Sequence, residues 1–208
     1  MELQFYGANC VRLTTKKAKV VIDDNLGDLG LKPVIKADEI AVYSGAHGPV
    51  SVDTQLIIDQ PGEYEVSDVS VKGIAARGHM DEADKQTATI YRIDAEDTRV
   101  GILGHIYPEL SDAQLEALGT IDVLIVPVGG SGYTLDPVGA LHLIKEIEPK
   151  IVIPTHYDEK GLKYPVPQLS LEEALKGLAM EPKETVPKLK IKPADFGEST
   201  ELIVLERQ

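Results

Sequence analysis

The stretch at residues 122–130, DVLIVPVGG, decides the fold class of this chain. The apolar run 121–127 ends just before Gly129 and Gly130, and such a run between turn residues is typical of a strand buried on both faces. Residues 151–153, IVI, form a second run of this kind. Between the two runs, Asp136 followed by Pro137 is typical of a helix N-cap and first helical residue. The second half of the chain is therefore predicted to alternate strands and helices.

Two further segments of this half carry helix signals. Ser111 and Gln114 have the spacing of a capping box, and Gly119 ends that helix. Ser170 and Glu173 repeat the capping-box spacing. The helix that starts at Asp136 carries an apolar stripe that stops before Pro149.

The first half shows short apolar or alternating segments separated by turn residues, which predicts a β-rich meander. The Pro- and Lys-rich residues 181–192 are expected to cross the surface, and residues 202–205 to return as a last strand. The prediction is one α+β domain over residues 1–208, with two mixed sheets flanked by helices. Strands are expected at residues 3–6, 10–14, 19–23, 55–59, 68–76, 87–93 and 99–103.

Composition excludes several classes of protein. With 43% hydrophobic and 26% charged residues among 208, the chain is typical of a globular protein rather than a disordered one. A net charge of −13 argues against general nucleic-acid binding. The single cysteine, Cys10, excludes an intramolecular disulfide. No signal peptide or membrane-spanning segment is apparent, so a cytoplasmic protein is expected.

Histidines provide the clearest functional signal. Four of the five, His47, His79, His105 and His156, follow the ends of predicted strands, where scaffolds place functional groups. Four imidazoles suffice for a tetrahedral zinc site, but loop histidines bonded to backbone or water are the alternative. His142 lies within a predicted helix, and no ligand role is expected for it.

Other reactive side chains have simpler interpretations. Cys10 lies in a predicted strand and is expected to be a small core residue. Ser131 lies in a glycine-rich loop that lacks the Gly-Lys-Ser/Thr of a phosphate loop, so a substrate-lining role is expected. Asp23 and Asp24 could bind a cation, or they could cap the following turn.

Taken together, four segments resemble the metallo-β-lactamase superfamily, in its branch of short metal-dependent hydrolases similar to ascorbate-6-phosphate lactonases. The resemblance extends from about Leu3 to Tyr157 and implies an αββα sandwich with a one- or two-zinc site. In that family a metal-bound hydroxide attacks a lactone, ester or phosphodiester. The segments are 61–65 (PGEYE), 89–93 (TIYRI), 122–130 (DVLIVPVGG) and 151–157 (IVIPTHY).

The family's metal ligands match this chain only in part. Its first motif, His-x-His-x-Asp-His, corresponds to residues 45–50, GAHGPV, where only His47 is retained. His79 and His156 match the third and last histidines of the family, and His105 stands where a bridging aspartate is expected. Because a neutral imidazole cannot bridge two cations as a carboxylate does, a standard dinuclear site is not expected.

Two hypotheses follow from the resemblance. The first is a hydrolase with one zinc ion on His47, His79, His105 and His156, acting on a small-molecule substrate through a metal-bound water. The second is a non-catalytic module that has lost the metal site and binds a small ligand or a protein partner; homo-oligomerisation would favour it. Neither nucleic acid nor a membrane is an expected partner. In the first hypothesis the substrate wall includes Gly129, Gly130, Ser131 and Tyr133.

Overall fold

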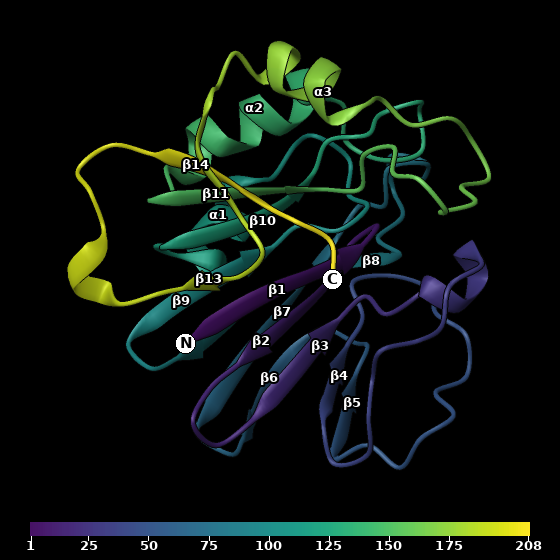
Figure 1. Cartoon of the computed structure of the whole chain (residues 1–208), viewed down its shortest axis with the longest axis vertical. Helices are drawn as coiled ribbons and strands as arrows, with labels where there is room; N and C mark the ends of the chain where they lie inside the picture. The colour runs from purple at the N-terminus through teal and green to yellow at the C-terminus, as the bar shows by residue number, and fades with distance from the viewer.

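Two β-sheets enclose most of the core, with helices against one outer face (Figure 1). The computed structural model describes residues 1–208 apart from the side chain of Asp195. The six-stranded sheet has the order β13 (Leu189–Lys190), β1 (Glu2–Gly7), β2 (Cys10–Thr14), β3 (Lys19–Ile22), β4 (Ile40–Val42) and β5 (Leu56–Ile58).

The second sheet has eight strands and is also mixed. Its members β6 to β9 are antiparallel neighbours, whereas β9, β10, β11, β14 and β12 run parallel to one another. The order is β12 (Pro182–Val186), β14 (Glu201–Leu205), β11 (Ile151–Thr155), β10 (Val123–Pro127), β9 (Thr98–Ile102), β8 (Ala88–Ala95), β7 (Val69–Ala76) and β6 (Gly62–Val66).

Helices begin at the N-caps that the sequence predicts. The side chains of Ser111, Asp136 and Ser170 each accept a hydrogen bond from a backbone N–H three residues later, which satisfies a donor that the helix itself leaves free. None of the described helices is long and apolar enough to span a membrane. The α-helices are α1 (Asp112–Leu118), α2 (Pro137–Ile147) and α3 (Leu171–Leu178); two short 3₁₀ helices, η1 (Leu26–Leu29) and η2 (Pro193–Asp195), complete the set.

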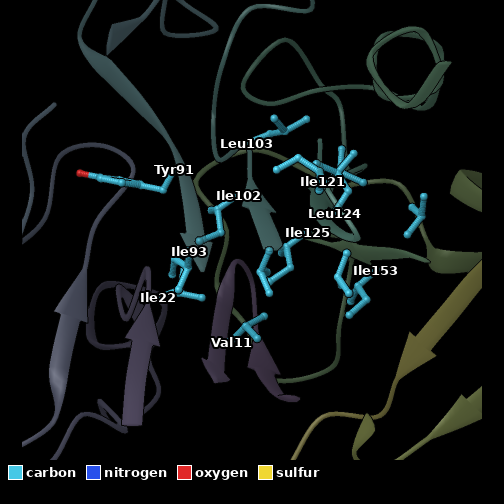
Figure 2. Close-up of a cluster of buried hydrophobic side chains, with 14 of the residues drawn as sticks. Val11, Ile22, Tyr91, Ile93, Ile102, Leu103, Ile121, Leu124, Ile125 and Ile153 are labelled. Carbon is cyan, nitrogen blue, oxygen red and sulfur yellow. The ribbon is translucent and has the colours of Figure 1, made fainter. Parts of the chain in front are cut away.

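Apolar side chains on both faces of the eight-stranded sheet form the core. Figure 2 shows Val11 and Ile22 of the six-stranded sheet on the same side as Ile93 and Ile125. Leu124, next to Ile125, points to the opposite face of β10, as the alternation of a strand requires. The continuous apolar pattern of β10 and β11 is thus explained by burial on both faces, and the expected α+β class is confirmed.

One expectation needs correction. Residues 181–192 do not merely cross the surface, because β12 pairs with β14 in one sheet and β13 pairs with β1 in the other. Most side chains of β12 are exposed, so backbone pairing at a sheet edge forms this strand without a hydrophobic pattern to reveal it.

Candidate functional site

A cavity of about 670 Å³ opens where the loops of both sheets meet. Its walls come from the turn after β1 and from the loops after β3, β4, β7, β9, β10 and β11. Ligand sites of open sheets commonly lie in this position, beyond the carboxyl ends of parallel strands. The fold therefore gathers loop residues from the whole length of the chain around one cavity.

Three of the four predicted metal ligands line this cavity, namely His79, His105 and His156. His47 is not among the described residues that line it. Its ring stacks on Tyr43 with centroids 3.9 Å apart, and its Nε2 atom lies 3.3 Å from Oδ2 of Asp59. The structure therefore brings three predicted ligands together and leaves the fourth apart.

The predicted substrate wall is divided in the same way. Tyr133 lines the cavity, whereas Gly129, Gly130 and Ser131 are not among its described lining residues. A Cβ added to Gly129 would lie 2.0 Å from the carbonyl oxygen of His156, so this glycine allows two loops to pack closely. Part of the glycine-rich loop thus has a packing role behind the cavity.

His105 is held by a chain of buried hydrogen bonds. The Thr155 hydroxyl donates to Oδ1 of Asn9 at 2.9 Å, which leaves Nδ2 of Asn9 to donate to Nε2 of His105 at 3.2 Å. Nε2 is therefore the acceptor of the neutral ring, and Nδ1 carries the proton. Nδ1 is itself buried without a hydrogen-bond partner among the described residues. Both ring nitrogens of His105 are thus unavailable to a ligand in the cavity.

The other two cavity histidines are anchored through Nδ1. Nδ1 of His79 lies 3.1 Å from the carbonyl oxygen of Ile106, and Nδ1 of His156 lies 3.2 Å from Oε1 of Gln168. Because these oxygens accept, each Nδ1 is the protonated nitrogen, and each Nε2 keeps its lone pair. These two imidazoles can accept a hydrogen bond or bind an electrophile.

Burial keeps two of these rings uncharged. Desolvation lowers the pKa of His105 to about 3, assisted by the nearby His156 and His79. Desolvation also lowers the pKa of His156 to about 4, although its hydrogen bond to Gln168 opposes the shift. At neutral pH the cavity therefore contains neutral imidazoles rather than cations.

Asp23 and Asp24 serve the loop structure. Both carboxylate oxygens of Asp23 accept from Ser44, one from the backbone N–H and one from the hydroxyl, each at 2.7 Å. Burial raises the pKa of Asp23 to about 6. Oδ2 of Asp24 accepts from the N–H groups of Val34 and Ile35, which agrees with the capping interpretation. Cys10 is buried, as expected for a core residue.

The donor set does not fit a hydrolytic metal centre. Such a centre normally has three protein ligands and an open position. Among the described residues, no group of three or more His, Cys, Asp or Glu side chains could hold a metal ion. The contacts explain this result, because His47 lies apart and the acceptor nitrogen of His105 is occupied by Asn9. The four-histidine zinc site therefore remains a prediction without support from this geometry.

Several site residues have no recognisable sequence signal. Asn9, Tyr164 and Gln168 contact the cavity histidines, yet none belongs to a motif or a periodic pattern. Only the placement of Asn9 between two short strands, within a predicted turn, could have indicated it as a loop residue.

Comparisons with known proteins agree with the fold and with the family resemblance. The model of the β-lactamase superfamily domain matches residues 2–156. A UPF0173 metal-dependent hydrolase of Enterococcus faecalis is 28% identical over 184 residues, which covers 78% of this chain and 76% of that protein. A second UPF0173 metal-dependent hydrolase, from Thermococcus kodakarensis, is 30% identical over 126 residues, or 59% of this chain and 50% of the other.

Solved structures give the same picture. A candidate Zn-dependent hydrolase of the metallo-β-lactamase superfamily from Thermotoga maritima superposes with a TM-score of 0.76 at 26% identity, covering 99% of this chain and 98% of the other. A metallo hydrolase from Ignicoccus hospitalis has a TM-score of 0.60 at 19% identity, covering 86% and 90%, and supports the fold alone. This chain is thus similar to metal-dependent hydrolases, although its own donor set differs from a hydrolytic centre.

Proposed function

Since the chain belongs to the β-lactamase superfamily, we propose that its cavity is the substrate cleft of that fold, and that the cleft binds a small molecule through hydrogen-bonding side chains instead of a hydrolytic metal centre. The cavity lies beyond the strand ends, in the usual place for a ligand. Its volume is within the range of small-molecule sites, about 300–1,000 Å³.

The arrangement around His105 carries this proposal. Asn9 donates to the acceptor nitrogen of His105, and Thr155 fixes the orientation of the Asn9 amide. A metal ligand needs a nitrogen lone pair directed at the ion. The ring could offer one only by leaving Asn9, which would leave the donor of Asn9 unpaired in a buried position.

The remaining imidazoles suit ligand binding. Nε2 of His79 and Nε2 of His156 can each accept a hydrogen bond from an N–H or O–H group. Because the ring of His156 packs against the rings of His105 and Tyr164, its orientation is fixed before a ligand arrives. A site with fixed acceptors loses less conformational entropy on binding.

A metal-dependent hydrolase is the second candidate function. The Nδ1 anchors of His79 and His156 resemble those of metal-bound histidines, which usually donate to an oxygen acceptor. The names of the relatives also favour it. In that case His105 would supply the third nitrogen after leaving Asn9, zinc would be the expected metal, and a lactone, ester or phosphodiester would be the substrate.

Metal content separates the two candidates. We would measure it by mass spectrometry on untagged wild type and on the His79→Ala, His156→Ala double variant, both purified without chelator and with zinc in the medium. The first proposal expects no stoichiometric metal in either protein. About one equivalent of zinc in the wild type and its loss in the double variant would overturn that proposal and support the hydrolase. His142→Ala, on the exposed face of α2, is the matched control.

A further inference from the structure

Charge in the cavity points to the class of ligand. Three aspartates line it, namely Asp23, Asp28 and Asp81, against a single cation, Lys163. The buried imidazoles of His105 and His156 add no positive charge at neutral pH. A phosphate group is normally bound by several cationic or N–H donors, and this cavity offers mostly acceptors.

The three carboxylates differ in how free they are. Asp23 accepts two hydrogen bonds from Ser44. Asp81 accepts from the N–H groups of Gly78 and Thr87, and from the Thr87 hydroxyl. Asp28, in η1, is exposed, and its carboxylate has no hydrogen-bond or ion-pair partner among the described side chains. Asp28 is therefore the carboxylate available to a ligand.

Aromatic rings form the adjoining wall. The centroid of His156 lies 4.8 Å from that of Tyr164 and 6.0 Å from that of Tyr133, and Tyr133 lies 4.9 Å from His105. All four of these residues line the cavity. The negative faces of tyrosine rings attract cations, and such contacts strengthen when the site is partly desolvated. The wall thus complements the same charge as Asp28.

We propose that this cavity binds small molecules carrying a positively charged amine, with the ammonium group between Asp28 and the wall of Tyr133 and Tyr164, and that it rejects phosphorylated ones. This inference rests on the proposed function, because it assumes that the cavity is the ligand site. It narrows the ligand class, since the phosphodiesters implied by the family resemblance are excluded.

A matched set of three probes tests the charge preference. Phenethylamine, phenethyl alcohol and 2-phenylethyl phosphate share one ring and linker but carry positive, zero and negative charge at neutral pH. Titration calorimetry on the wild type is expected to give the tightest binding for the amine, weaker binding for the alcohol and none for the phosphate. Equal binding of amine and alcohol, tighter binding of the phosphate, or binding of none of the three would overturn the inference.

Variants locate the amine in the cavity. Asp28→Asn is expected to weaken phenethylamine binding about fivefold, the effect of one solvent-exposed charge contact, and to leave the alcohol unchanged. Tyr133→Leu should weaken the amine by a similar factor through loss of the ring face. Asp53→Asn removes an exposed carboxylate outside the cavity lining and is the control. An equal loss in Asp53→Asn and Asp28→Asn would contradict the placement of the ligand.

The two proposals fail in different ways. Stoichiometric zinc on the cavity histidines would overturn the proposed function whichever probe binds. A preference for the phosphate in a metal-free protein would overturn only the ligand class, because the cavity would still bind a small molecule.

Discussion

Nδ2 of Asn9 lies 3.2 Å from Nε2 of His105, at the position where the family resemblance expects a bridging aspartate. The contact joins the turn between β1 and β2 to the loop after β9. Thr155, at the end of β11, extends the chain of hydrogen bonds from a third element. A polar network inside the protein thus occupies the nitrogen that a metal would need.

This network predicts a measurable coupling in stability. Asn9→Ala leaves Nε2 of His105 and the Thr155 hydroxyl unpaired, and it should lower the free energy of unfolding by about 2 kcal/mol. Thr155→Val should lower it by about 1 kcal/mol. Because both variants disrupt one chain, the double variant should lose less than the sum, as urea denaturation would show.

Asn25→Ala is the control for this cycle. Asn25 also lines the cavity, but its Nδ2 makes only a 3.5 Å contact to the carbonyl oxygen of Ala46. We expect its effect to stay below about 0.5 kcal/mol and to add to that of Thr155→Val. Strict additivity of Asn9→Ala and Thr155→Val would contradict the network.

Acid should destabilise the protein in a defined window. The folded pKa values of about 3 for His105 and about 4 for His156 lie below the ordinary value of 6.5, so the unfolded chain binds more protons as the pH falls below 6.5. Each histidine then lowers the unfolding free energy by about 1.4 kcal/mol per pH unit. Asp23, with its pKa raised from 3.8 to about 6, acts in the opposite direction between those values.

The expected net loss between pH 6 and pH 4 equals that of about one histidine, since Asp23 offsets the other. Urea denaturation at several pH values would measure it. His156→Gln should flatten the profile, whereas His142→Gln, at an exposed helix position, should leave it unchanged. A wild type equally stable at pH 4 and pH 6 would contradict the burial of neutral imidazoles.

The sequence alone predicts the parts of the fold that depend on local signals. The capping residues Ser111, Asp136 and Ser170 are visible because each satisfies a helix donor within its own segment. Strand β12 is not visible, because its stability comes from backbone pairing with β14, which lies 15 or more residues away and leaves no apolar alternation. Local pattern thus predicts elements better than it predicts their edges.

The site could be predicted only in part for a related reason. His79, His105 and His156 share a cavity because the strands before them end on the same side, which the strand pattern indicates. His47 also follows a strand, yet its ring turns onto Tyr43. Which nitrogen is free depends on partners such as Asn9 and Gln168 that are remote in sequence, and no spacing rule reveals them.

Gly104 should tolerate no side chain. Its backbone has φ = +60°, and a Cβ would lie 2.1 Å from Oγ of Ser44 and 2.6 Å from Cβ of Ser44. Gly104→Ala should therefore destabilise by about 3 kcal/mol, because it combines backbone strain with a clash behind the Asp23–Ser44 pair. Denaturant unfolding checks the value. Gly48→Ala, where a Cβ would meet no atom within 4 Å, should change stability by less than about 1 kcal/mol.

His47 should be dispensable for the cavity despite matching the family motif. Its ring stacks on Tyr43 at an interplanar angle of 12° and pairs with Asp59, outside the described lining. His47→Ala should therefore leave the phenethylamine Kd unchanged and lower the unfolding free energy by at most about 1 kcal/mol. His156→Gln, which alters a lining ring, should weaken binding at least severalfold in the same titration. A comparable loss in His47→Ala would place His47 in the ligand site and restore the four-histidine arrangement that the sequence predicts.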